Sequence, residues 1–257
     1  MKAKKSYGQH FLNKEDLAQR IAEGLSYVEK TKKILEVGPG KGMLTKYLKE
    51  QDAALFLVEA DRDMVAYLMK HFPALKEQII AADFLKVPID EIIKGEFCLI
   101  GNYPYNISSQ ILFKMLDYRA QIPEMVGMFQ KEVAERVVAK PGNKTYGVIS
   151  VLIQAYYEGE YLFSVPKEAF SPPPKVESGV IRLTRKSETD LGCDYKIFRR
   201  VVKQAFSQRR KMLRNTMKTF VKGNPLLEDA FFKQRPEQLS VAEFVKLTNW
   251  IAAQLEN

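Results

Sequence analysis

The chain has 257 residues, of which 46% are hydrophobic and 28% are charged, with a net charge of +9. This length suits one large domain, or one domain with a small appendage. No uncharged apolar run approaches the ~18 residues that a membrane span needs, and Gln9 and His10 interrupt any apolar signal segment. The two cysteines, Cys98 and Cys193, lie far apart in the sequence, which predicts reduced thiols in a cytoplasmic protein. With only two histidines and no cysteine cluster, no metal site is expected. Because no apolar span is present, we also expect no membrane contact.

Apolar runs alternate with helical patterns over the first half of the chain. Strands are predicted at residues 32–37, 54–61, 79–83, 97–102 and 124–130. Helices are predicted between and after them, at residues 43–50, 62–72, 107–118 and 132–139. Ser108 is the expected cap of the third helix. Because the strands are almost continuously apolar and alternate with helices, they predict an α/β domain with a parallel sheet covered on both faces.

A change of pattern predicts a second domain. Polar and turn-forming residues replace the apolar pattern over residues 180–194, and helical periodicity returns at residues 198–206, 228–234 and 242–256. We therefore expect an α/β domain over residues 1–190 and a small all-helical domain over residues 191–257.

The positive charge is concentrated around the start of this second domain. Twelve Lys and Arg residues against three Asp and Glu residues lie between Arg185 and Lys222, whereas the remaining residues carry 28 charges of each sign. Such a cluster fits a solvated basic helix face as well as a phosphate-binding surface. The cluster alone leaves both interpretations open.

The segment ILEVGPGKG, residues 34–42, reads as a strand that runs into a glycine-rich turn and a helix. Glycine lets a backbone approach a ligand closely, although tight strand–helix turns also need it for steric reasons. The glycines concerned are Gly38, Gly40 and Gly42. Polar side chains stand at the ends of the next three strands: Glu59, Asp83 and Asn102. Together they describe the crevice in which open α/β sheets bind ligands.

The spacing of the glycines in this loop helps to indicate which nucleoside-containing ligand it binds. Its GxGxG pattern differs from the GxGxxG of dinucleotide-binding folds, whose further features serve a pyrophosphate. A carboxylate at Glu59 can accept hydrogen bonds from both ribose hydroxyls and disfavours a 2′-phosphate. S-adenosylmethionine has a ribose and an adenine but no phosphate, so we favour it over NAD.

The segment GNYPYN, residues 101–106, follows the fourth strand. Pro104 biases Tyr103 toward an extended conformation, which directs its carbonyl group outward. That carbonyl and the side-chain oxygen of Asn102 can hold the two hydrogens of an exocyclic amine such as adenine N6, while Tyr105 stacks on the base. An ordinary proline turn would explain Pro104 alone. We therefore predict a methyl-transfer site that works by positioning and by stabilising positive charge, without a strong general base.

Several motifs occur in one consistent order: GQHFLN, ILEVGPGKGMLT, VEAD, AADF, GNYPYNIS, EAFSPPPKVESGVIRL and FSQRRKMLRN. In this order the chain resembles the ribosomal small-subunit RNA adenine dimethyltransferases, the KsgA family, from Gly8 to about Asn215. The resemblance implies a Rossmann-like S-adenosylmethionine-dependent methyltransferase domain with a small helical C-terminal domain. It also implies N6,N6-dimethylation of two adjacent adenosines near the 3′ end of 16S-type small-subunit rRNA. The implied partners are small-subunit rRNA and the small ribosomal subunit precursor, and we expect a monomer with a role in subunit maturation.

The resemblance also implies roles for single residues. His10, which stands where many members have Asn, and Leu12 would border the cofactor. Gly38, with Gly40 beside it in the loop, would meet the methionine portion. The remaining cofactor contacts would be Glu59 to the ribose, Asp83 to the adenine, and Asn102 to both cofactor and target amine.

Further roles concern the RNA. Tyr103 replaces the more usual leucine and is expected to place a second ring at the pocket mouth, and Phe170 is expected to pack against the target base. That base would reach the pocket by flipping. The proline run at residues 171–175 could serve as a polyproline ligand, but we expect a rigid loop that shapes the pocket. rRNA phosphates would be contacted by Arg209, Arg210, Lys211 and Arg214.

Three alternatives stay open. Large-subunit rRNA adenine methyltransferases share the fold and chemistry, but the full FSQRRKMLRN and GNYPYNIS segments argue against them. An RNA-binding assembly factor without catalysis would not need intact Gly38, Glu59, Asp83 and Asn102. A protein-glutamine methyltransferase would use a similar Asn-x-Pro-Tyr loop, yet its substrate does not call for the basic C-terminal cluster.

Overall fold

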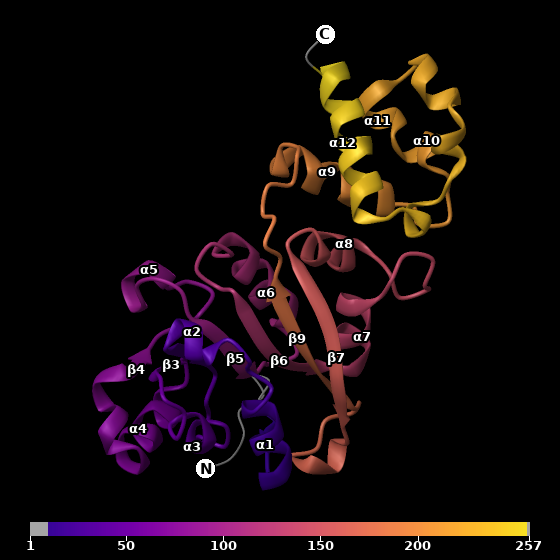
Figure 1. The fold of residues 1–257 in the computed structure, drawn as a ribbon. Helices are drawn as coiled ribbons and strands as arrows, with labels where there is room; N and C mark the ends of the chain where they lie inside the picture. Colours follow the sequence, from indigo (N-terminus) through magenta and orange to yellow (C-terminus); the bar gives the residue numbers. More distant parts are fainter. Residues whose placement is uncertain (1–9, 256–257) are drawn as a thin grey trace. The chain divides into compact units, whose positions relative to one another are not determined.

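The computed structural model describes residues 10–255, which form two compact units. The first consists of the residues up to Ala134 together with Glu158–Arg185 (Figure 1). The second consists of Glu135–Tyr157 and the residues from Lys186 onward. The packing thus groups residues 135–157 with the C-terminal segment, and the expected division into domains at residue 190 stays a prediction.

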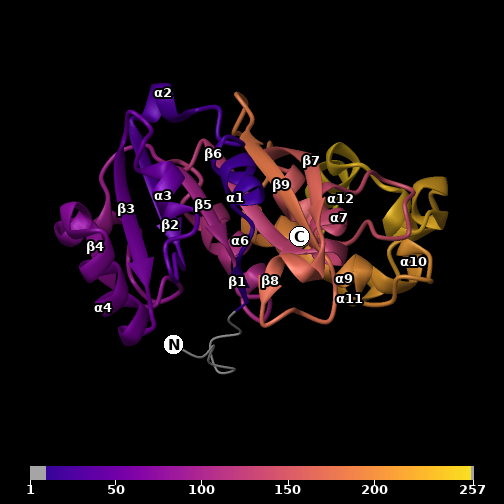
Figure 2. The same cartoon turned by 90° about the horizontal axis from the view of Figure 1, so that it is seen from below.

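A seven-stranded sheet forms the centre of the first unit, in the order β4-β3-β2-β5-β6-β9-β7 (Figure 2). The strands are β2 (Lys33–Val37), β3 (Ala54–Glu59), β4 (Ile79–Ala81), β5 (Cys98–Asn102), β6 (Glu124–Gln130), β7 (Tyr157–Val165) and β9 (Ser178–Arg185). β2 to β6 pair in parallel, as predicted, but β9 is antiparallel to β6. The predicted break over residues 180–194 is therefore wrong in its first part, since residues 180–185 complete β9.

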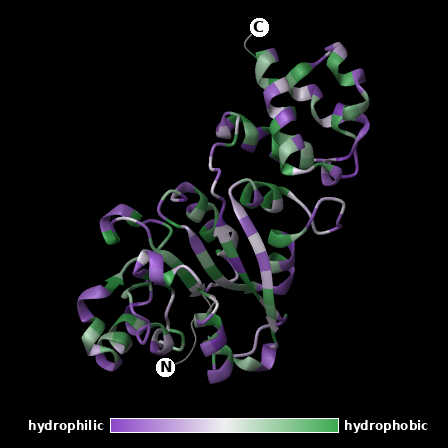
Figure 3. Cartoon of the chain, viewed as in Figure 1, coloured by the Kyte–Doolittle hydropathy of each residue, from purple (hydrophilic) through white to green (hydrophobic). Residues whose placement is uncertain are grey.

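Helices connect these strands. They are α1 (Glu15–Ala22), α2 (Val28–Thr31), α3 (Thr45–Leu48), α4 (Arg62–His71), α5 (Ile89–Ile92), α6 (Ser108–Asp117) and α7 (Lys131–Val138), with short 3-10 turns η2 (Pro73–Gln78) and η3 (Lys167–Ala169). The helices carry both hydrophilic and hydrophobic residues, as expected for elements with one buried face (Figure 3). Ser108 does not cap α6: Ile107 occupies that position, and the buried Ser108 hydroxyl instead donates to the Tyr105 carbonyl.

A short ladder carries the N-terminal segment to the end of the sheet. β1 (Phe11–Leu12) pairs antiparallel with β8 (Phe170–Ser171), with Leu12 opposite Phe170. The backbone N–H of Asn13 extends the ladder by donating to the carbonyl of Ala169 at 2.8 Å. The ladder places His10 beside the end of β5, where the side chain of Asn102 contacts it.

A buried carboxylate fixes the connection between α1 and α2. Glu124 at the start of β6 is fully buried, and it accepts hydrogen bonds from the Ser26 N–H at 2.8 Å, the Ser26 hydroxyl at 2.5 Å and the Tyr27 N–H at 3.0 Å. A buried carboxylate is tolerated where donors satisfy its oxygens. Glu124 therefore ties this loop to the sheet.

The second unit is helical. Its helices are α8 (Val148–Gln154), α9 (Tyr195–Phe206), α10 (Leu213–Thr216), α11 (Lys218–Val221) and α12 (Val241–Leu255), with 3-10 turns η4 (Pro225–Glu228), η5 (Ala230–Lys233) and η6 (Pro236–Gln238). The expected helix over residues 228–234 is wrong, because the Asp229 side chain caps a new turn at Phe231 and divides the segment. Within the described residues, no helix combines the length and apolar character needed to cross a bilayer.

Candidate active site

A cavity of about 740 Å³ lies at the carboxyl ends of β2, β3 and β5. The neighbours of β2 in the sheet are β3 and β5, so the order of the strands reverses at this point. Such a switch point is where open α/β sheets bind ligands. The cavity is lined by all seven residues predicted to contact a cofactor: His10, Leu12, Gly38, Gly40, Glu59, Asp83 and Asn102.

The glycine loop borders this cavity with a left-handed backbone. Gly38, Gly40 and Gly42 have φ values of +70°, +55° and +76°. A Cβ on Gly38 would meet no atom of the described residues within 4 Å, whereas a Cβ on Gly42 would lie 2.3 Å from Cε2 of Phe72. Gly38 therefore presents open backbone to the cavity, and Gly42 is needed for close packing against Phe72.

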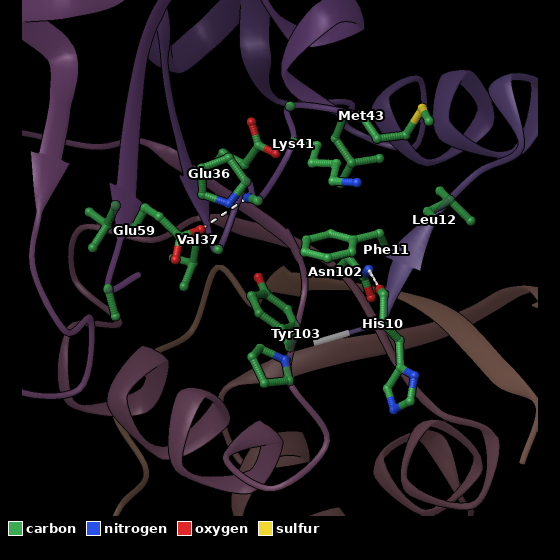
Figure 4. A pocket seen from close by; sticks show the side chains of 18 of the residues that line it. His10, Phe11, Leu12, Glu36, Val37, Lys41, Met43, Glu59, Asn102 and Tyr103 are labelled. Carbon is green, nitrogen blue, oxygen red and sulfur yellow. Dashed lines mark hydrogen bonds between the residues drawn. The ribbon is translucent and has the colours of Figure 1, made fainter. Parts of the chain in front are cut away.

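Glu59 at the end of β3 is held by the same loop. Its Oε2 accepts the Gly40 N–H at 3.0 Å (Figure 4). Its Oε1 accepts the Asp61 N–H at 2.9 Å. Burial raises the pKa of Glu59, and the backbone N–H groups of Asp61 and Gly40 oppose that rise. Each carboxylate oxygen can accept a second hydrogen bond. The side chain can therefore serve a ribose diol without releasing the loop.

Asp83 follows β4 and shapes the next part of the rim. Its Oδ1 accepts the Leu85 N–H at 2.9 Å. From α6, the Lys114 ammonium group donates to the carbonyl oxygens of Phe84 and Val87. No sequence pattern indicated this role for Lys114, which attaches the turn after Asp83 to the helix that follows GNYPYN.

Asn102 is oriented by the N-terminal segment. Its Nδ2 donates to the His10 carbonyl at 3.0 Å (Figure 4). That contact leaves the Asn102 Oδ1 as an acceptor on the cavity side. The Tyr103 carbonyl also accepts no hydrogen bond from any residue in the described part of the chain. The two acceptors predicted for an exocyclic amine are therefore both available beside the cavity.

The ring of Tyr103 lies inside the molecule, and the expectation of a ring at the pocket mouth is wrong. Its side chain is 1% exposed, and its ring centroid lies 5.1 Å from that of Phe129. A Cβ on Gly101 or Gly127 would come within 2.6 or 2.5 Å of the Tyr103 ring. The two glycines thus leave the space that this ring fills, and the ring forms part of the inner wall of the cavity.

Tyr105 and His10 form an aromatic pair at the cavity. Their ring centroids are 5.4 Å apart with an interplanar angle of 28°. The Tyr105 hydroxyl is 2.7 Å from the Ser178 hydroxyl, and His10 Nδ1 donates to the Pro172 carbonyl at 2.8 Å. Both rings are therefore fixed in orientation. Gly8 and Gln9 of the GQHFLN motif lie outside the described residues.

Phe170 is not brought into the cavity. It is 3% exposed and packs in the hydrophobic core with Leu12 and Ala169, while its neighbour Ser171 lines the cavity. Its position follows from the β1–β8 ladder, which sets Phe170 opposite Leu12. Contact between Phe170 and a target base stays a prediction.

Glu36 is a site residue that the sequence reasoning missed. It lies on β2, is 1% exposed and lines the cavity, and its Oε2 accepts the Thr45 hydroxyl at 2.6 Å. Burial raises the pKa of Glu36 to about 8. An acidic residue inside the apolar run KKILEV was the available signal, since an unpaired carboxyl group in a buried strand needs a reason.

The predicted RNA-binding residues lie in the second unit, around the turn between α9 and α10. Arg210 and Lys211 are exposed, and no carboxylate in the described part of the chain pairs with either. Arg209 donates to the Asn143 carbonyl at 3.1 Å, and Arg214 lies half-buried on α10. Arg210 and Lys211 are therefore the two whose charges are most available to a partner.

Comparison with known proteins identifies relatives along the whole chain. A ribosomal RNA small subunit methyltransferase A from Cytophaga hutchinsonii is 54% identical over 253 residues, which cover 98% of each chain. One of the same name from Bacteroides thetaiotaomicron is 53% identical over 258 residues, covering 100% of this chain and 96% of the relative.

Two solved structures of RNA methyltransferases are also similar to this chain. A dimethyladenosine transferase from Plasmodium falciparum matches with a TM-score of 0.78 and 25% identity, over 95% of this chain and 98% of that one. The 23S rRNA methyltransferase ErmE matches with a TM-score of 0.67 and 24% identity, over 93% and 99%, which shows a shared fold. The predicted Rossmann-like methyltransferase fold is thereby confirmed. The family model described as ribosomal RNA adenine dimethylase matches residues 1–253, and the chain belongs to that family.

Proposed function

We propose that this chain dimethylates N6 of two adjacent adenosines near the 3′ end of small-subunit rRNA, with S-adenosylmethionine as methyl donor. The proposal rests on two available acceptors, Asn102 Oδ1 and the Tyr103 carbonyl oxygen. Both lie beside a cavity that Glu59 lines. The names of the relatives support rRNA of the small subunit as the substrate. We further propose that the protein acts as a cytoplasmic monomer on the small ribosomal subunit precursor.

The residues that line the cavity fit the donor. Glu59 keeps two acceptor positions for a ribose diol, and Gly38 offers backbone without a Cβ to hinder approach. Asp83 accepts the Leu85 N–H at Oδ1, and its Oδ2 lies 3.8 Å from the Nζ of the exposed Lys86. A long, solvent-exposed ion pair of this kind is weak, so Oδ2 can still accept a hydrogen bond from an adenine amine. When bound, S-adenosylmethionine supplies an electrophilic methyl group. No pyrophosphate-binding feature is required of the loop, in agreement with its GxGxG spacing.

The chain's contribution at the target amine is positioning. Asn102 Oδ1 and the Tyr103 carbonyl would each accept one N–H of adenine N6, which turns the nitrogen lone pair toward the methyl group. The same two oxygens are oriented to stabilise the positive charge that develops on nitrogen. The alkylated nitrogen is acidic and loses its proton readily. The reaction therefore does not need a strong general base.

The target base would be held by aromatic contact after flipping out of the RNA. Tyr105 is fixed by Ser178 and by the His10 ring, so one face of the pair can receive an adenine without a loss of side-chain freedom. In the second unit, Arg209, Arg210, Lys211 and Arg214 would contact rRNA phosphates.

The test is transfer of tritium from labelled S-adenosylmethionine to unmethylated small ribosomal subunits, with large subunits as the parallel substrate and nucleoside analysis of the product. The proposal expects N6,N6-dimethyladenosine in small-subunit rRNA only. Label in large-subunit rRNA would support the alternative of a large-subunit enzyme. RNA binding without any label would support a catalytically silent assembly factor.

Asn102→Ala tests the proposed acceptor. Removal of an oriented group that acts on developing charge should lower methylation by about 100-fold or more, while affinity for S-adenosylhomocysteine changes little. Asn249→Ala is a matched control, because the Asn249 amide also donates to a backbone carbonyl, that of Gly192. Equal losses of methylation and cofactor affinity in Asn102→Ala would mean that Asn102 serves mainly the cofactor.

A further inference from the structure

Lys114 makes contacts that are unusual for a lysine on a helix. Its side chain is half-buried, and its ammonium group donates to the carbonyl oxygens of Phe84 and Val87. No backbone N–H of the described residues donates to either carbonyl group. Burial lowers the pKa of Lys114, and the carboxylates of Asp83 and Asp117 oppose that change. Because lysine is seldom withdrawn from water without a partner, these contacts indicate a specific task.

The turn that Lys114 holds carries two residues of the cavity wall, Asp83 and Phe84. At the start of the turn, Asp83 accepts the Leu85 N–H at its Oδ1, at 2.9 Å, and the Val87 N–H at its carbonyl oxygen, at 3.0 Å. At the other end, Lys114 binds the remaining carbonyl groups, and its Nζ lies 5.0 Å from the centroid of the Phe84 ring. Lys114 itself does not line the cavity. It therefore supports two side chains that a ligand would touch, without touching the ligand.

The helix that carries Lys114 begins at the loop GNYPYN. α6 starts at Ser108, whose hydroxyl donates to the Tyr105 carbonyl at 3.1 Å. Further along the helix, Ile111 and Met115 are fully buried. A helix that is closely packed in this way moves as one piece. α6 is therefore bonded to the loop of the target amine at its first turn, and through Lys114 to the turn of the cavity wall.

We propose that Lys114 is a positioning residue that fixes the Asp83 turn to α6, and that α6 thereby links the adenine of the donor to the loop that holds the target amine. The inference rests on the proposed function, in which Asp83 meets that adenine and Asn102 and Tyr103 meet the amine. Contact of Asp83 and Phe84 with an adenine favours the closed turn, which holds α6 through Lys114. Donor binding then orders the target loop, and by thermodynamic reciprocity the target strengthens donor binding.

Lys114→Met tests the positioning role, because it removes the ammonium group and keeps an unbranched side chain. Two carbonyl groups then lose their donor, so the turn is closed in only a fraction of the molecules. Apparent affinity falls with the fraction of molecules that can bind, and calorimetry on the full chain should show about tenfold weaker binding of S-adenosylhomocysteine. Lys114→Arg should restore most of this affinity, since a guanidinium group can also donate to both carbonyl oxygens.

Lys33→Met is the matched control. The Nζ of Lys33 also donates to a loop carbonyl, that of Lys94 at 2.6 Å, but Lys33 lies at the amino end of β2 and does not line the cavity. This variant loses a contact of the same kind away from the site, so its affinity for S-adenosylhomocysteine should stay within about twofold of that of the unmodified chain. Equal weakening in Lys33→Met and Lys114→Met, or unchanged affinity in Lys114→Met, would overturn the role of Lys114.

Hydrogen exchange of the backbone amides tests the link through α6. Residues 108–112 form the first part of α6 and do not line the cavity, so S-adenosylhomocysteine can slow their exchange only through the protein. In the unmodified chain, the ligand should slow exchange over residues 83–87 and over residues 108–112. In Lys114→Met at the same ligand occupancy, the first effect should remain and the second should be lost.

Two results would count against the inference in different ways. Slowing over residues 108–112 that is equal in both proteins, or absent from both, would overturn the link while leaving the proposed donor intact. Failure of the unmodified chain to bind S-adenosylhomocysteine would instead overturn the proposed donor, and the inference with it.

Discussion

Replacement of Glu36 by glutamine should change how the stability of this protein depends on pH. Glu36 is 1% exposed, and burial raises its pKa from 4.5 to about 8. The folded chain therefore keeps a proton on Glu36 at pH values where the unfolded chain has lost it. The resulting stabilisation is complete below about pH 4.5, and it is lost as the pH rises toward 8.

The size of the effect follows from the same two values. At about 1.36 kcal/mol for each pKa unit, a rise from 4.5 to about 8 corresponds to at most about 5 kcal/mol. Glutamine is close to glutamic acid in shape, carries no charge and can still accept the Thr45 hydroxyl. The variant should match the unmodified chain near pH 5 and be more stable above pH 8 by up to about 5 kcal/mol.

Urea unfolding at a series of pH values from 5 to 9 measures this difference directly. Other groups titrate in both proteins, including Glu59, whose pKa is also raised by burial. The difference between the free energies of unfolding of the variant and the unmodified chain isolates the contribution of Glu36. This difference should grow by about 1.4 kcal/mol per pH unit between about pH 4.5 and about pH 8. A difference that stays constant across the series would refute the assignment of a protonated, buried Glu36.

Two further variants test the packing of the site and the RNA contact. Gly101→Ala should lower the free energy of unfolding by about 1–3 kcal/mol in urea titration, because the new Cβ would lie 2.6 Å from the Val37 carbonyl oxygen. Gly147→Ala is the control and should change the free energy of unfolding little, since among the described residues its Cβ would approach nothing closer than an oxygen at 3.9 Å. Equal effects of the two substitutions would contradict this account. Reversal of both exposed charges, Arg210→Glu with Lys211→Glu, should weaken rRNA binding and lower the slope of log affinity against log salt by about 2. The same two reversals at exposed lysines of the first unit, Lys76 and Lys94, serve as the control; an unchanged slope at Arg210 and Lys211 would mean a solvated basic face.

The sheet was predictable where its strands are buried on both faces. β2, β3, β5 and β6 have almost continuous apolar runs, and each run was recognised. β7 was not recognised, because it lies at the edge of the sheet and its polar residues Glu158 and Glu160 are exposed. Residues 180–185 form a strand because they pair with β6, which lies more than 40 residues earlier in the chain. No local pattern therefore distinguishes these residues from a turn.

The candidate site was predictable to the extent that its residues end strands. Gly38, Glu59, Asp83 and Asn102 follow buried runs, and the parallel sheet brings such ends together. Tyr103 was placed wrongly because its position depends on Gly127, a glycine on another strand. Lys114 gave no signal, since a lysine in a helix is normally solvated, and its carbonyl partners at Phe84 and Val87 come from a loop far away in sequence.

The space around the Tyr103 ring has a consequence for how this site can vary among relatives. Position 101 is constrained by backbone, because a side chain there would meet the Val37 carbonyl whatever stands at 103. The atoms nearest to a Cβ at position 127 belong instead to side chains, at 2.5 Å in the Tyr103 ring and 2.6 Å in the Phe129 ring. A larger residue at 127 would therefore need smaller residues at both 103 and 129, and these three positions should covary while 101 remains glycine.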